Sequence, residues 1–111
     1  MNFEVRKSKF ITDNTVAINI DLIKKEGIHI GYCISTINKE AIGEIDSLFI
    51  DKEYREFGLG DKLMTRGLEW LNTNNVKTKI IAVAEGNEKV LEFYKKYNFY
   101  KRRVVLEQIN K

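Results

Sequence analysis

The spacing of hydrophobic residues changes at about residue 60, and this change constrains the fold of the chain more than any other feature. Before it, apolar and polar residues alternate, as they do in strands with one buried face. Strands are predicted at residues 3–11, 15–23, 28–36 and 44–50. Turn-prone residues, such as Thr12 to Asn14, separate these segments. The first half is therefore predicted to be an antiparallel meander.

The second half of the chain has a helical period followed by a short apolar run. Residues 60–75 carry apolar side chains on one side of a helix, and residues 79–84, KIIAVA, are typical of a strand buried on both faces. A strand, a helix and a strand in this order need a crossover, which makes the two strands parallel. A second helix, with Asn87 as its N-cap and Asn98 in the left-handed C′ position, and a last strand at 100–108 are expected to complete the chain.

These elements predict an α/β (α+β) fold in one domain, residues 1–111. The sheet should be mixed and mostly antiparallel, with a central parallel βαβ pair and two main helices. A chain of 111 residues can bury one genuine core and is too short for two ordinary domains.

The charges and the single cysteine exclude several classes of protein. The net charge of +3 is mild, and no apolar run is long enough to cross a membrane, so neither nucleic acid nor a membrane is an expected partner. Cys33 stands alone, which favours a cytoplasmic protein. His29 and Cys33 share one strand face without further ligands, so no metal site is expected and structural roles are favoured.

The segment YREFGLGDKL places Gly58 and Gly60 between a predicted strand and a predicted helix. The first amides of a helix have no internal partner, and glycine can adopt positive φ and allow a ligand close to the backbone. Such N–H groups at the positive end of a helix suit a phosphate or pyrophosphate. The alternative is a tight turn that needs glycine for its geometry alone. The segment matches neither a dinucleotide fingerprint nor a P-loop.

Two motifs give the chain its family resemblance. Arg55, Gly58 and Gly60 form RxxGxG, which resembles the Q/R-x-x-G-x-G/A motif of the GCN5-related N-acetyltransferase family. NEKVLEFYKKYNF is similar to the Asn-led helix of that family, which ends in FYxxxGF. The motifs flank a predicted buried strand, and the resemblance extends from about Gly43 to Tyr100.

The resemblance implies a site for acetyl-CoA where the strand at 44–50 and the KIIAVA strand splay apart. Backbone groups of the first strand would bind the pantetheine and acetyl groups, the loop amides would hold the pyrophosphate, and Asn87 would contact the cofactor arm. The implied cofactor-binding residues are Leu48, Phe49, Ile50, Arg55, Glu56, Phe57, Gly58, Leu59, Gly60 and Asn87.

The same resemblance implies two catalytic residues. Tyr94 matches the tyrosine that protonates the departing thiolate, although a core aromatic is the alternative. Glu44, counted back from Arg55, matches the strand glutamate that acts as base in histone-acetylating members. Asp46 is the second candidate, and a solvated strand position is the alternative for both. A base is needed because a lysine-like amine, with a pKa near 10.4, is almost entirely protonated at neutral pH.

The predicted function is direct transfer of an acetyl group from acetyl-CoA to an amine acceptor, a small molecule or a protein amine. The rival is a CoA-sensing or protein-binding module without catalysis. Family members usually carry helices between their first two strands, whereas this chain has room for only a turn, so the acceptor site is open or completed in a homodimer. Asp61 would repel a pyrophosphate, and Lys62 and Arg66 are expected to offset its charge.

Overall fold

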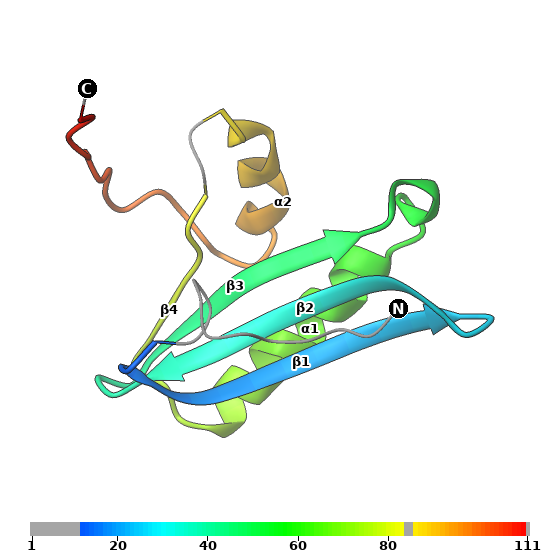
Figure 1. Cartoon of the computed structure of the whole chain (residues 1–111), viewed down its shortest axis with the longest axis horizontal. Helices are drawn as coiled ribbons and strands as arrows, with labels where there is room; N and C mark the ends of the chain where they lie inside the picture. The colour runs from blue at the N-terminus through cyan, green and yellow to red at the C-terminus, as the bar shows by residue number, and fades with distance from the viewer. Residues whose placement is uncertain (1–11, 84–85, 111) are drawn as a thin grey trace.

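The computed structural model describes residues 12–83 and 86–110, and it contains a four-stranded sheet in the order β1-β2-β3-β4. The predicted strand at 3–11 lies outside the described residues. The strands are β1 (Thr15–Lys25), β2 (Ile28–Asn38), β3 (Ile42–Ile50) and β4 (Thr78–Ile80). β1 to β3 form the described part of the predicted antiparallel meander, and β4 pairs with β3 in parallel (Figure 1). The predicted fold class is confirmed.

The β1–β2 hairpin shows why these strands form where they do. Glu26 and Gly27 make the two-residue connection, with φ of 51° and 81°. Two successive left-handed residues match the twist of the flanking strands and fix the hairpin register. Alternate residues of each strand then face the same side of the sheet.

Helix α1 (Leu59–Thr73) covers one face of the sheet, which is the far face in Figure 1. Its apolar stripe of Leu63, Met64 and Leu71 is buried against Cys33 and Ile45. Figure 1 also shows that α1 runs along the length of β1 to β3. The core therefore lies between the meander and this one helix.

The second helix is shorter than predicted. A 3-10 turn, η2 (Glu88–Val90), precedes α2 (Leu91–Lys95), and the residue that caps α2 is Val90 rather than the predicted Asn87. Asn87 still contributes its carbonyl, which accepts a hydrogen bond from the Val90 amide. The chain leaves α2 through Asn98, whose φ of 67° has the left-handed value expected after a helix.

The C-terminal prediction is wrong in two respects. β4 is shorter than the predicted strand at 79–84, and the predicted strand at 100–108 is not formed. Residues 100–110 leave Val104, Val105 and Leu106 exposed, so no buried apolar surface offsets the conformational entropy of ordering a strand there. In the described part of the chain β4 consequently has no strand at its outer edge, and none of residues 79–83 is fully buried.

Candidate active site

The site begins where β3 separates from β4. The parallel ladder pairs Ile42 with Thr78, Gly43 with Lys79 and Glu44 with Ile80, and it extends no further. Among the described residues, β3 therefore continues from position 45 to 50 without a strand on this side. The predicted splay of the two parallel strands is present.

A β-bulge lies immediately beyond the end of that ladder. The β2–β3 register shifts at Asp46, because Ile34 lies opposite Ser47 while Ser35 lies opposite Ile45. Such an extra residue bends the strand and redirects its side chains and backbone groups. The bulge therefore contributes to the divergence of β3 from β4.

Backbone groups of β3 beyond the bulge are turned toward the splay. The Asp51 amide donates to the Ile30 carbonyl at 2.7 Å, and groups in an antiparallel pair alternate in direction. By this alternation Leu48 and Ile50 present their N–H and C=O groups away from β2. The Ile50 carbonyl accepts a hydrogen bond from Arg55 Nε at 3.0 Å, which agrees with this direction.

The loop after β3 provides a second group of backbone donors. It passes through the 3-10 turn η1 (Lys52–Tyr54) and two left-handed residues, Glu56 and Gly58, with φ of 72° and 74°. Gly58 is the N-cap of α1 and has no side chain to occupy the first amides of the helix. A Cβ atom on Gly58 would meet nothing within 4 Å, so the space beside it is open. These features are those of an anion-binding nest.

The two glycines of this loop differ in their roles. Gly58 has the positive φ, whereas Gly60 lies inside α1, because the helix begins one residue earlier than predicted. A Cβ on Gly60 would lie 3.5 Å from the ring of Phe93. Gly60 is therefore the point where the first turn of α1 approaches α2.

Asp61 is not offset by the predicted cations. Arg66 Nε instead donates to Asp21 Oδ1 at 2.9 Å. Five residues of helix separate Asp61 from Arg66 by about 140° around the axis, so their side chains point in different directions. The partners of Asp61 directly follow α2: Lys96 Nζ lies 2.9 Å from its Oδ1, and the Tyr97 hydroxyl donates to the same oxygen.

Glu44 and Asp46 form a pair of carboxyl groups at the end of the β3–β4 ladder. Gly43 and Ile45 face α1, so Glu44 between them points to the opposite face of the sheet. Burial raises the pKa of Glu44 from an ordinary 4.5 to about 7, helped by the charge of Asp46 and by a hydrogen bond between the two carboxyls. Glu44 can therefore exchange a proton near neutral pH.

Tyr94 lies on the other side of the sheet from Glu44. It is half-buried on α2 and packs against the core between the sheet and α1. Its ring meets that of Phe93 edge-on, with centres 5.4 Å apart. Burial, and then the nearby Cys33 thiol, raise the pKa of Tyr94, so its phenol is protonated at neutral pH.

The remaining predicted binding residues, apart from Asn87, lie at the end of β3, in the loop and at the start of α1. Arg55, Glu56 and Phe57 are exposed in the loop, Leu59 is partly buried at the start of α1, and Phe49 is exposed on the sheet face opposite α1. Asn87 is exposed before η2.

In residues 12–83 and 86–110, no group of His, Cys, Asp and Glu side chains is arranged to hold a metal ion, and no helix has the length and apolar character to span a membrane.

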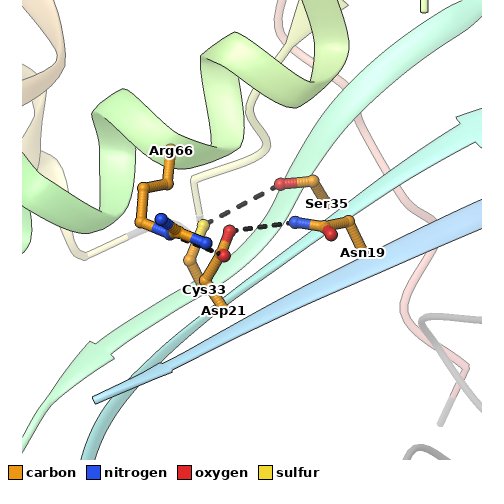
Figure 2. A network of polar contacts seen from close by, with 5 residues as sticks. All are labelled: Asn19, Asp21, Cys33, Ser35 and Arg66. Carbon is orange, nitrogen blue, oxygen red and sulfur yellow. Dashed lines mark hydrogen bonds and ion pairs between the residues drawn. The ribbon is translucent and has the colours of Figure 1, made fainter.

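A polar network between the sheet and α1 was missed by the sequence analysis. Figure 2 shows Asn19 Nδ2 donating to Asp21, which also binds Arg66 of α1, with Cys33 and Ser35 beside them. Asp21 is only 7% exposed, and burial raises the pKa of the Cys33 thiol to about 11. Asn19 and Asp21 two residues apart on a strand were the only available signal, because the partner lies 45 residues away.

Known proteins are similar to this chain in sequence. Residues 4–99 match the Acetyltransferase (GNAT) family, and the chain belongs to that family. It is 31% identical over 72 residues to an uncharacterized N-acetyltransferase of Methanocaldococcus jannaschii, covering 65% of this chain and 32% of that protein. It is 29% identical over 82 residues to the mycothiol acetyltransferase of Acidimicrobium ferrooxidans, covering 70% and 26%. The chain thus spans about a third or less of these relatives' length.

A solved structure supports the fold independently. The chain superposes on an aminoglycoside N-acetyltransferase in complex with CoA with a TM-score of 0.70 at 13% identity, covering 90% of this chain and 79% of that one. At this identity the likeness concerns the fold. It agrees with the mixed sheet and the parallel β3–β4 pair.

Proposed function

We propose that this protein is an N-acetyltransferase that moves an acetyl group from acetyl-CoA directly to an amine. The observation that carries the proposal is the part of β3 beyond the ladder, residues 45 to 50, which among the described residues has no strand on the β4 side and ends at the left-handed loop that leads into α1. One strand edge and one helix N-terminus thus present backbone donors to the same region. Membership in the acetyltransferase family supports this interpretation.

The residues present fit acetyl-CoA. The open space at Gly58 and the uncapped amides at the start of α1 suit the pyrophosphate, and the edge of β3 at Leu48 to Ile50 suits the amide-rich pantetheine arm. Acetyl-CoA would supply an activated thioester and a thiolate leaving group. Exposed Arg55, Glu56, Phe57 and Asn87, with Leu59, Gly60 and Phe49, would line its path.

Glu44 would accept a proton and Tyr94 would donate one, from opposite sides of β3. A carboxyl group with a pKa of about 7 is substantially ionised at neutral pH, so Glu44 can accept a proton from an amine, and Asp46 beside it is the alternative base. Tyr94 holds its proton at neutral pH and can donate it to a thiolate. The position of the two groups on different faces suits an amine and a thioester that enter from different sides.

The decisive experiment is a thermal unfolding scan with and without acetyl-CoA. Ligand at about a hundred times its dissociation constant stabilises by about 2.7 kcal/mol, a shift on the order of ten degrees for a domain of this size. Gly58→Glu should abolish the shift. Gly27→Glu is the matched control, since Gly27 has a similar φ of 81° and equally open surroundings.

Turnover separates the enzyme from a CoA-sensing or protein-binding module. A shift that Gly58→Glu abolishes, together with acetylation of a panel of amines, supports the proposal. A shift without acetylation of any amine favours the module without catalysis. No shift at millimolar acetyl-CoA would mean that Gly58 only makes a turn, and both cofactor-binding functions would fail.

A further inference from the structure

The first turn of α1 contains a charge that opposes its proposed ligand. Asp61 is the third residue of the helix and so lies in the same turn as the uncapped amides beside Gly58. An aspartate there interacts favourably with the helix dipole, yet it repels any anion bound at the same end. The protein therefore needs a means of limiting the field of Asp61.

One face of α2 meets this aspartate. Phe93, Lys96 and Tyr97 are spaced by three and four residues and so lie side by side along α2 and the turn that follows it. The Phe93 ring packs on Gly60, Lys96 Nζ lies 4.6 Å from the centre of that ring, and both Lys96 and Tyr97 bind Asp61. Hydrogen bonds from Tyr97 and then Lys96 lower the pKa of Asp61, so this carboxylate is ionised at neutral pH.

The contacts with Lys96 and Tyr97 also determine which hydrogen-bond donors the Asp61 carboxylate binds. An acidic side chain at the third helical position often turns back toward the N-cap amide. Here Asp61 Oδ1 instead receives the ammonium of Lys96 and the hydroxyl of Tyr97. The amides of the loop and of the first turn keep their capacity to bind a ligand.

We propose that Lys96 and Tyr97 are positioning residues for the phosphate end of CoA, because Lys96 neutralises Asp61 and both residues hold its carboxylate at the end of α2. This inference rests on the proposed function, and it gives α2 a second role besides carrying Tyr94. In this arrangement Lys96 acts on the bound anion through Asp61 and does not need to touch it.

Structural support alone does not explain the arrangement. The side chains of Lys96 and Asp61 are 52% and 49% exposed, and ion pairs so accessible to water contribute little to stability. Variants at these positions should therefore fold. Their effect should be found in the affinity for an anion, where the charge of Asp61 acts over a short distance.

The test is a set of charge variants measured by calorimetric titration with CoA. Lys96→Met should weaken CoA binding about fivefold at low salt, because it leaves the Asp61 charge uncompensated. Asp61→Asn in the Lys96→Met background should restore affinity to within about twofold of wild type, and Tyr97→Phe should give a smaller loss. The loss should shrink in about 0.5 M salt.

Two controls isolate the charge at this position. Lys95→Met removes the same charge from the neighbouring residue, which pairs with Glu92 at 3.0 Å, and should leave CoA affinity unchanged. Pantetheine, which lacks the pyrophosphate, should bind Lys96→Met and wild type equally.

Each other outcome has a definite meaning. An equal loss from Lys96→Met in the Asp61→Asn background would show direct contact of Lys96 with the ligand and overturn the inference. An unchanged affinity in Lys96→Met would overturn it as well, while leaving the proposed function in place. Wild-type protein that does not bind CoA would remove the proposed function itself, and this inference with it.

Discussion

Replacement of Glu44 by Gln tests the raised pKa of this residue without any assumption about the substrate. Glutamine has nearly the same shape and can donate a hydrogen bond to Asp46, as protonated Glu44 does. It cannot ionise. The comparison therefore isolates the free energy of placing a negative charge on Glu44 in the folded protein.

The sign and size of the effect follow from proton linkage. The folded pKa is raised from 4.5 to about 7, so the native state binds more protons than the unfolded state between these values. The contribution of Glu44 to stability is thus fully present below pH 4.5 and is lost as the pH rises through about 7. A rise of this size corresponds to at most about 3 kcal/mol. Because Glu44 is partly exposed and shares a proton with Asp46, about 1–2 kcal/mol is expected.

Urea unfolding at pH 5 and pH 8 measures this difference. Glu44→Gln should be more stable than wild type by about 1–2 kcal/mol at pH 8 and by about half of that or less at pH 5, which lies just above the ordinary pKa of 4.5. Glu107→Gln removes the same charge from an exposed position and should show no such pH dependence. A stability difference that does not change between pH 5 and pH 8 would refute the raised pKa and, with it, the physical basis of the proposed base.

Three further predictions concern the acid, the buried network and the helix contact. Tyr94→Phe should slow acetyl transfer more than tenfold while changing the affinity for acetyl-CoA less than twofold, and equal rates would remove the acid role. Arg66→Met should lower the urea midpoint more than Lys62→Met does, because it takes the cationic partner from buried Asp21; equal midpoints would contradict this. Gly67→Ala should lower the free energy of unfolding in urea by about 1–2 kcal/mol, although Ala has the better helix propensity, because its Cβ would lie 3.0 Å from Ser35 Oγ. A more stable variant would contradict this and show that α1 can move away from β2 at little cost.

Local sequence was sufficient for the elements that depend on near neighbours. The alternation at 15–23 and 28–36 and the helical spacing at 60–75 correspond to β1, β2 and α1, with ends that differ by two residues or fewer. The positive φ of Gly58 was also predictable, because it depends only on the local turn that leads into α1. In each case the pattern and its consequence lie within one element or one turn.

Features that depend on two distant segments were not predictable in the same way. The bulge at Asp46 is a property of the β2–β3 register, and neither strand shows it alone. Arg66 donates a hydrogen bond to Asp21, 45 residues away in the sequence, and Tyr97 donates one to Asp61, 36 residues away. The strand predicted at 100–108 failed for a related reason. Its run of apolar residues from Val104 to Leu106 resembles a strand, but pairing requires a neighbour that the sequence pattern does not specify.

The close packing of α1 explains how the two halves of the proposed site keep their relation to each other. A Cβ on Gly67 would crowd Ser35 and Ile45, and a Cβ on Gly43 would lie 2.7 Å from Leu71. Glycine at these two positions lets α1 approach β2 and β3 closely along its buried face. The start of α1 belongs to the same rigid helix, so its amides are fixed relative to the free edge of β3. Preorganised donors on rigid elements bind an anion without the cost of ordering them first, which is why packing far from Gly58 matters for the site.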